Sequence, residues 1–256
     1  MTHSHMKNES VAVELKDLRF SYEKGKFALD GIDLKIKKGE CFGILGPSGA
    51  GKSTLLLHLN GILRGEGSVI INGLEVSKKT IFAIRQKVGL VFQNPDDQLF
   101  NPTVEEDIAF GPANMGLDEV DVRNRVAGAL KSLNLEGFEK KTSHHLSFGE
   151  RKRVALATVL SMQPEIIAFD EPFSNLDPAM VRQLIDTINA LDATVILVSQ
   201  AIIPTLACCD RLAVLKQGKI AASGDAGELV ADTQLLRDCD LDFYFYCDIC
   251  RTLKIK

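Results

Sequence analysis

The sequence predicts an α/β fold with a mixed sheet, an N-terminal antiparallel β subdomain and an inserted α-helical subdomain. Three observations support this prediction. Short apolar strands alternate with helical stretches, a glycine-rich turn joins the apolar run Cys41 to Leu45 to a helix, and loops with helices replace strands between about 95 and 160. Such alternation is typical of a parallel sheet covered by helices. We therefore expect one domain over residues 11–225, with the helical lobe over about 95–160 inserted into it.

The N-terminal part of the chain is expected to be mainly β. Residues 11–20 alternate between apolar and polar side chains, and Asn72-Gly73 is a typical hairpin turn. The elements expected here are strands at 11–20, two short strands within 27–38 joined at Asp30-Gly31, strands at 41–45, 68–71 and 88–92, and a helix at 54–63.

The rest of the chain changes from helical to alternating. The expected elements are helices near 103–109, 119–133 and 148–161, a strand at 165–169, a helix at 178–191, a strand at 194–199, and a hairpin of 211–215 and 219–222 around Gly218. We expect residues 1–10 to be a disordered start or a cloning remnant. Residues 226–256 are expected to form a C-terminal appendix with a weak helix and an aromatic tail.

The composition is that of an ordinary globular protein. The 256 residues are 45% hydrophobic and 25% charged, with a formal net charge of −4, so no global basic field attracts nucleic acid or acidic lipid. The longest purely aliphatic run, Val195 to Val198, is far too short to cross a bilayer, and no signal peptide is evident. We therefore expect a cytosolic protein that binds no nucleic acid and that can dock onto a membrane protein.

Cysteine usage points to free thiols. A cytosolic chain of this size keeps no disulfides among its six cysteines. Cys247 and Cys250 have the spacing of metal ligands, but a zinc site needs a second pair, for which Cys239 offers one candidate ligand. Buried or incidental thiols are therefore favoured over a metal or redox site.

A phosphate-binding loop follows the apolar run at 41–45. Residues 46–54 match the pattern G-x-x-x-x-G-K-[ST] between a predicted strand and a predicted helix, which is the context that the pattern requires. Its glycines let consecutive backbone N–H groups face a phosphate, Lys52 adds a point charge, and Ser53 offers a hydroxyl to Mg²⁺. The predicted nucleotide-binding residues of this P-loop core are Gly46, Pro47, Ser48, Gly49, Ala50, Gly51, Lys52, Ser53 and Thr54.

An acidic pair ends a second apolar strand. Residues 166–169 are apolar and are followed by Asp170 and Glu171. Open α/β sheets bind ligands at the carboxyl edge of their strands, so Asp170 is predicted to hold Mg²⁺ through water there. Glu171 is then placed to orient or deprotonate an attacking water. The alternative is a pair of solvated acids without a role.

A helix start with unusual charge lies at 146–157. Ser147 and Glu150 form a capping-box pattern, and Arg151, Lys152 and Arg153 follow in the first two helical turns. Cations at this end oppose the helix dipole by about 0.3–1 kcal/mol each when exposed. Either the cluster is a solvated face, or an anion binds close to it.

Together these motifs resemble an ABC-type ATPase over residues 11–225. The residues that carry the resemblance are 46–54, Gln93, 146–150, 166–171 and 174–177, in the order and spacing of that family. A P-loop kinase would have no use for the signature at 146–150 or for 174–177. The resemblance implies two subunits packed head to tail, with ATP between the P-loop of one and the signature of the other. Ser147, Gly149 and Glu150 would then meet the partner's ATP, and Arg151 to Arg153 would mostly face solvent or acids.

A second resemblance is narrower. Gln93 to Gln98 and Thr103 to Pro112 are similar to the ATPase subunits of energy-coupling-factor importers, which take up vitamins or cobalt and nickel in prokaryotes. It implies that Gln93 senses the nucleotide and its Mg²⁺ while its loop faces the membrane partner, and that Tyr22 stacks on adenine; the alternative for Tyr22 is an aromatic in the core. Asp177 would shape the opposite site. The implied partners are integral membrane subunits at the cytoplasmic face and a second ATPase chain, identical or related.

Two positions depart from the family pattern. Phe148 and Glu150 replace the third and fifth residues of the usual Leu-Ser-Gly-Gly-Gln, although Ser147 and Gly149 remain. The family places a histidine after the strand at 194–199, where this chain has Gln200. A glutamine amide donates a hydrogen bond but carries no proton or charge.

Two functional hypotheses remain. The first is a transport motor in which ATP closes the dimer and hydrolysis opens it, supported by Glu171, Gln93 and Asp177. The second is a binding module that dimerises on ATP but hydrolyses it poorly, motivated by Gln200. Loss of one well-placed donor typically costs about 10²–10³ in rate.

Overall fold

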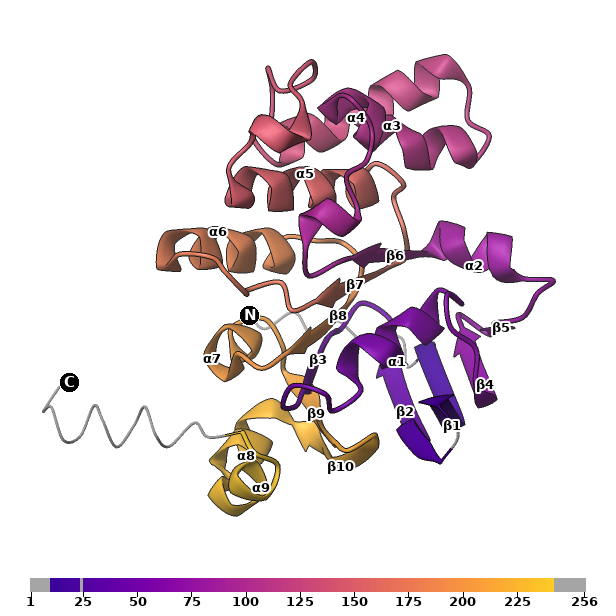
Figure 1. The fold of residues 1–256 in the computed structure, drawn as a ribbon, viewed down its shortest axis with the longest axis vertical. Helices are drawn as coiled ribbons and strands as arrows, with labels where there is room; N and C mark the ends of the chain where they lie inside the picture. The colour runs from indigo at the N-terminus through magenta and orange to yellow at the C-terminus, as the bar shows by residue number, and fades with distance from the viewer. Residues whose placement is uncertain (1–9, 24, 242–256) are drawn as a thin grey trace, which may run out of the picture.

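The computed structural model describes residues 10–23 and 25–241 and arranges them in two sheets and a helical lobe (Figure 1). The strands are β1 (Val11–Glu23), β2 (Lys26–Lys37), β3 (Cys41–Leu45), β4 (Glu66–Ile71), β5 (Leu74–Glu75), β6 (Val88–Val91), β7 (Ile166–Asp170), β8 (Thr194–Ser199), β9 (Arg211–Lys216) and β10 (Lys219–Asp225). The α-helices are α1 (Lys52–Leu59), α2 (Ile81–Lys87), α3 (Val104–Asn114), α4 (Glu119–Ser132), α5 (Phe148–Leu160), α6 (Pro178–Asn189), α7 (Ile202–Leu206), α8 (Ala226–Ala231) and α9 (Thr233–Asp238). Two 3₁₀ turns, η1 (Pro95–Asp97) and η2 (Ser143–His145), complete them.

The central sheet positions the site. Its order is β10-β9-β3-β8-β7-β6, and every neighbouring pair is parallel except β10 with β9. On one face of the central sheet, α1 and the second sheet share one hydrophobic core. Leu55 of α1, Leu15 of β1 and Ile196 of β8 belong to this core. On the other face α5 and α6 pack with Phe169 and Leu197. The predicted α/β fold with a mixed sheet is confirmed.

The second sheet is antiparallel, in the order β2-β1-β4-β5. The segment 27–38 was predicted as two strands joined at Asp30-Gly31, but β2 is one continuous strand that pairs with β1 along its length. Gly31 has φ +76°, which only glycine adopts freely, so the chain bends there without leaving the sheet. The prediction of two strands was wrong because Asp30-Gly31 forms a bend within one strand and not a turn between two.

The helical lobe consists of α3, α4 and α5, at the top of Figure 1. The helix was predicted near 103–109, but α3 extends further and continues through Pro112 to Asn114. A proline inside a helix leaves the carbonyl four residues earlier without its donor. Here the Ser161 hydroxyl donates to that oxygen, Ile108 O, at 2.8 Å. A side chain from α5's end therefore replaces the missing bond and lets the helix pass the proline.

The C-terminal region packs against the edge of the central sheet. The weak helix predicted in 226–256 is present as two short helices, α8 and α9, whose Leu236 is buried with Leu212 and Val214 of β9. Lys216 pairs with Asp240 at 2.9 Å. The aromatic tail, Cys247 and Cys250 lie outside the described residues, as do residues 1–9. The helices α2 and α7 were not predicted. Within the described ranges, none of the helices is long and apolar enough to span a membrane.

The cysteines of the described part of the chain are free. Cys41 and Cys209 place their sulfurs 3.1 Å apart, and burial raises the pKa of the neighbouring Cys208 to about 12. A thiol with a raised pKa stays protonated and unreactive at neutral pH. Cys239 is buried, and among the described residues no His, Cys, Asp and Glu cluster could hold a metal ion.

A candidate nucleotide site

The glycine-rich loop connects β3 to α1 at the carboxyl edge of the central sheet. Gly51 has φ +106°, and a Cβ there would lie 2.4 Å from Ala28 O, so only glycine fits. It is also the N-cap of α1 and provides no side-chain cap, and the first turn contains no acid. The helix N-terminus is therefore open to an anion. A cavity of about 440 Å³ lies beside the loop, between it and the β1–β2 hairpin.

Lys52 is held at the bottom of this loop. Its ammonium donates to Gly46 O at 2.8 Å and to Pro47 O at 3.1 Å, and it lies 3.1 Å from Glu171 Oε1. Both side chains are nearly buried, at 6% and 11% exposure. A buried charge needs a counter-charge, so Glu171 neutralises Lys52 where no phosphate is bound.

The two acids lie directly beside the loop, as the sequence predicts. Ser53 Oγ donates to Asp170 Oδ1 at 2.9 Å, which brings two hard oxygen ligands together from α1 and β7. Burial raises the pKa of Asp170, and the Ser53 hydrogen bond opposes that shift. Such oxygens suit Mg²⁺, so the residues present fit that ion.

Glu171 adopts a backbone conformation that is uncommon outside glycine. Its φ is +42°, and its side chain is buried. The backbone is fixed because Glu171 N donates to Val198 O at 2.9 Å, and the carboxylate is fixed because Gln200 N donates to Oε2 at 3.1 Å. Strain of this kind persists where surrounding contacts over-determine it, often at functional sites.

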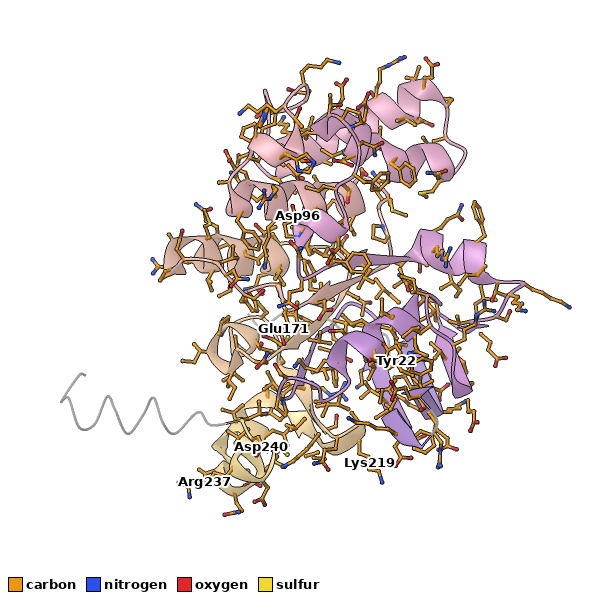
Figure 2. All side chains as sticks on the ribbon, viewed as in Figure 1. Tyr22, Asp96, Glu171, Lys219, Arg237 and Asp240 are labelled. Carbon is orange, nitrogen blue, oxygen red and sulfur yellow. The ribbon has the colours of Figure 1, made fainter. Side chains whose placement is uncertain are left out.

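Gln200 lies at the same edge, after β8. Its Nε2 donates to Ser48 Oγ of the loop at 3.2 Å. The residue that stands in place of the family histidine therefore reaches the phosphate loop with an N–H donor. Figure 2 shows Glu171 near the middle of the molecule, with Asp96 toward the helical lobe and Tyr22 toward the antiparallel sheet.

Tyr22 forms the outer wall of the cavity. Its ring is 63% exposed, which excludes the alternative of a core aromatic, and its hydroxyl lies 3.2 Å from Thr54 Oγ1. The ring of Phe20 packs edge-to-face against the rings of Tyr22 and His58, with centroid distances of 4.8 Å and 4.9 Å. His58 Nδ1 donates to Thr54 O at 2.7 Å, and burial lowers its pKa. The sequence analysis missed Phe20 and His58, although the period-2 spacing from Tyr22 and the helical spacing from Thr54 could have indicated them.

The second group of predicted residues lies apart, at the start of α5. Ser147 Oγ accepts from Glu150 N at 3.3 Å, and Ser147 N donates to Glu150 Oε2 at 2.7 Å, so the predicted capping box is present. These backbone and side-chain hydrogen bonds from Ser147 lower the pKa of Glu150. Ser147 is exposed, whereas Gly149 is buried against Met180. None of the hydrogen bonds of these residues, over the part of the chain that is described, reaches the phosphate loop.

The basic cluster of α5 is not a solvated face. Arg151 Nε lies 3.3 Å from Asp96 Oδ1, which fits the expectation of neighbouring acids. Lys152 and Arg153 instead donate to backbone carbonyls, Lys152 to Pro172 O at 2.8 Å and Arg153 to Leu133 O at 3.3 Å. The expectation that they face solvent or acids is wrong for these two, because their long side chains reach loops on either side of the helix.

Two further predicted residues are Gln93 and Asp177. Gln93 is exposed just after β6. Asp177 caps α6 by accepting from Ala179 N and Met180 N, both at 2.9 Å. The structure thus brings together residues 46–54, Asp170, Glu171, Gln200 and Tyr22. Among the described residues, no hydrogen bond or ion pair joins Gln93, Asp177 or residues 147–150 to this group.

A glycine loop with a buried lysine, a serine beside an aspartate and a fixed glutamate define the class as a P-loop nucleoside triphosphatase. The comparisons with known proteins narrow it. The ABC transporter family model matches residues 29–174. Energy-coupling factor transporter ATP-binding protein EcfA of Methanocaldococcus jannaschii is 47% identical over 235 residues, 90% of this chain and 84% of that protein. EcfA of Methanococcus maripaludis is 45% identical with the same coverage.

Solved structures agree with the sequence relatives. CbiO1 from Clostridium perfringens, part of the ABC transporter complex cbiONQ, superposes with a TM-score of 0.81 and 36% identity, covering 96% of this chain and 100% of that one. The dimeric ATP-binding cassette MJ0796 bound to ADP and Pi gives a TM-score of 0.75 at 29% identity, covering 84% and 98%. The chain belongs to the ABC transporter family, as its ATP-binding, ATP-hydrolysing subunit of the energy-coupling-factor type.

Proposed function

We propose that the chain works as the motor of a membrane importer, in a head-to-tail pair of ATPase subunits. One observation carries this proposal: the phosphate loop and the start of α5, where Ser147 is exposed, lie in different parts of one chain (Figure 1). A second copy, or a related chain, would bring Ser147 and Gly149 to the first subunit's ATP. The head-to-tail pair would thus complete each site.

Nucleotide binding would replace an internal ion pair. Lys52 lies against Glu171, so incoming phosphates compete with that carboxylate for the ammonium. Tyr22 would stack on the base, and the backbone N–H groups of the loop would hold the phosphates. Release of Glu171 from Lys52 would leave its carboxylate free to act on water.

Hydrolysis would depend on Glu171 as the base that orients or deprotonates water. Gln200 N donates to that carboxylate, and the Gln200 amide, which donates to Ser48 Oγ of the loop, would donate to the terminal phosphate. Ser53 and Asp170, with Gln93 from the loop after β6, would hold Mg²⁺, which when bound neutralises charge developing on the phosphates. Lys52 would hold the same phosphates from below.

The proposed substrate class rests on the resemblance to energy-coupling-factor importers. EcfA proteins are named for energy-coupling factor transporters, and cbiO1 is part of a cbiONQ complex. We propose uptake of cobalt or nickel, or of a vitamin, with the chain at the cytoplasmic face of a prokaryotic membrane. The exposed loop around Gln93 would face the membrane subunits, and Asp177 would help shape the partner's site. The second ATPase chain would be identical or related.

The test is ATP turnover of the purified chain with its copurified membrane subunits, compared with Glu171→Gln. The proposal expects substrate-dependent turnover far above that variant, and radiolabelled cobalt, nickel or vitamin uptake into vesicles containing the complex. Turnover no higher than that of Glu171→Gln, with the membrane subunits present, overturns the motor.

Gln200 motivates a second candidate, a module that closes on ATP but hydrolyses it slowly. Its amide occupies the position of a donor, as the 3.2 Å contact to Ser48 indicates, but it cannot take up a proton. The variant Gln200→His separates the two functions. A rise of about 10²-fold in turnover favours the weak module. An unchanged rate favours the motor, with glutamine sufficient at this position.

A further inference from the structure

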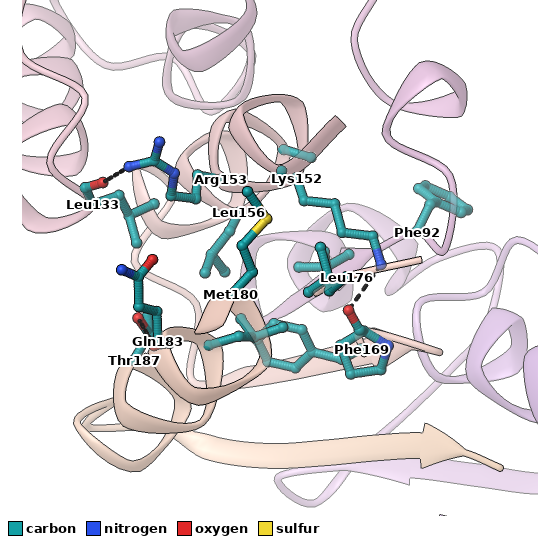
Figure 3. Close-up of a pocket in the computed structure, with 15 residues that line it drawn as sticks. Phe92, Leu133, Lys152, Arg153, Leu156, Phe169, Leu176, Met180, Gln183 and Thr187 are labelled. Carbon is teal, nitrogen blue, oxygen red and sulfur yellow. Dashed lines mark hydrogen bonds between the residues drawn. The ribbon is translucent and has the colours of Figure 1, made fainter. Parts of the chain in front are cut away.

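A cavity lies between the N-terminal half of the signature helix and α6, although the rest of this helix packs into the core. It has a volume of about 230 Å³ and lies between α5 and α6, over β7 (Figure 3). Leu156 lines it from α5, Leu184 from α6 and Phe169 from the sheet. Close-packed interiors transmit movement through many small contacts, but a void removes those contacts. The direct links that bridge these two walls therefore carry more of the coupling between them.

Lys152 is such a link. From α5 its ammonium donates to Pro172 O at 2.8 Å, to Ser174 O at 2.9 Å and to Ser174 Oγ at 3.4 Å. Figure 3 shows Lys152 with one of these hydrogen bonds as a dashed line. An ammonium has three donors, and these three acceptors use all of them. Burial lowers the pKa of Lys152 to about 8, against the attraction of Glu171, so this charge is retained at a cost in desolvation.

The acceptors of Lys152 belong to the segment that follows the catalytic glutamate. Pro172 comes directly after Glu171, and Ser174 Oγ donates to Glu171 O at 2.8 Å. Lys152 itself stands in the second turn of α5, whose first turn carries Ser147 and Gly149. One side chain thus joins the helix that would face the partner's ATP to the backbone that orients Glu171 in its own site.

We propose that Lys152 is a positioning residue that couples the two nucleotide sites of the dimer. The inference rests on the proposed head-to-tail pair. ATP in one site would fix Ser147 and Gly149 of the facing subunit. Lys152 of the facing subunit would then fix residues 172–174 of that same subunit. Because Glu171 precedes this segment, the glutamate of the second site would be fixed at the same time. Occupancy of one site would therefore favour hydrolysis in the second.

The test uses the full chain, with its ATP-dependence of turnover and its ATP affinity measured separately. Wild type is expected to show a Hill coefficient approaching 2, the number of sites. Lys152→Met keeps the length of the side chain but has no donors, so the coefficient should fall toward 1 with at least a 10-fold loss in maximal rate. Nucleotide affinity of the isolated chain should stay within 2-fold. Lys131→Met, on the exposed surface of α4, should leave both quantities unchanged.

A second pair of variants separates coupling from folding. Lys152→Arg keeps the charge and the donors and should restore most of the cooperativity. Ser174→Ala removes the 3.4 Å contact of Lys152 and the Ser174 hydrogen bond to Glu171 O, but the Pro172 and Ser174 carbonyls still accept from the ammonium. It should therefore lower the Hill coefficient less than Lys152→Met does. If Lys152→Met melts before the assay temperature, it is compared with wild type below its melting temperature, and unchanged cooperativity there counts against the coupling.

The outcomes distinguish the inference from the proposed function. ATP-dependent dimers whose wild-type and Lys152→Met forms are equally cooperative, or whose wild type shows a coefficient of 1, overturn the role of Lys152 alone. A Glu171→Gln chain that stays monomeric at saturating ATP, with related subunits supplied, overturns the head-to-tail pair and the inference with it.

Discussion

Two parts of this molecule differ in how their polar groups are satisfied. The phosphate loop is internally satisfied, because Lys52 is bonded to two loop carbonyls and neutralised by Glu171, while Ser53 meets Asp170. The start of α5 is satisfied only by its own cap, with Ser147 exposed to whatever faces it. The contacts of the loop therefore lie within one chain, whereas under the proposed head-to-tail pair the start of α5 would meet the nucleotide of a neighbour.

This difference predicts which measured property each substitution should change. Changes in the loop half should alter nucleotide affinity or chemistry in a single chain. Changes at the start of α5 should leave single-chain binding intact and alter only what requires two chains. Four variants test this division, from the largest expected effect to the smallest.

Glu171→Gln should give the largest effect. Removing a general base typically lowers a rate by about 10²–10⁴-fold. The neutral amide no longer competes for Lys52, so ATP affinity should be equal to wild type or higher. Steady-state turnover and equilibrium binding measure the two effects, with the exposed Glu136→Gln as control. A loss of affinity that parallels the loss of turnover would contradict the internal ion pair.

Lys52→Met should lower the affinity for nucleotide by about 10²-fold or more. It removes the phosphate's point charge and also leaves Glu171 buried without its partner, which typically costs about 3–5 kcal/mol of stability. Binding is measured by titration and stability by thermal melting, beside Lys38→Met on the exposed surface. The paired variant Lys52→Met/Glu171→Gln should recover stability without recovering affinity; a single variant as stable as wild type would show that the pair is not formed.

Gly149→Ala should separate binding from assembly. The added Cβ would meet only the flexible end of Met180, at 2.4 Å from Sδ, so the fold should tolerate it. Single-chain ATP affinity should stay within 2-fold, while ATP-dependent dimerisation falls at least 10-fold. Gly128→Ala, with open space around it on α4, is the matched control. Normal dimers from Gly149→Ala would place the partner's contact elsewhere.

Ser147→Ala should give the smallest change in turnover of the four variants, with a modest loss of stability. Loss of an N-cap typically costs about 1 kcal/mol. Asp118→Ala removes the corresponding cap of α4 and should cost a similar amount, as thermal melting would show. Of the two, only Ser147→Ala should lower dimer-dependent turnover. Equal turnover in both variants would reduce Ser147 to a structural cap.

Much of the site could be predicted because its signals are local. The loop 46–54, the acids after an apolar strand and the capping box at Ser147 each depend on neighbours within a few residues, so sequence spacing specifies them. Gln200 could be placed because β8 was recognisable as an apolar run that ends beside β7. The aromatic support of Tyr22 by Phe20 and His58 was missed, because it joins β1 to α1 across the space between them.

The sequence by itself determined the class of protein, the order of its motifs and the chemistry that each can perform, since these follow from residue type and short-range spacing. Only the tertiary structure decided where long side chains end. In the folded chain Lys152 donates to the carbonyls of Pro172 and Ser174. Likewise, the Ser161 hydroxyl donates to Ile108 O, the carbonyl that has no backbone donor because residue 112 is proline. Such contacts join segments far apart in the chain, and burial rather than local pattern selects them because each buried polar group requires a partner.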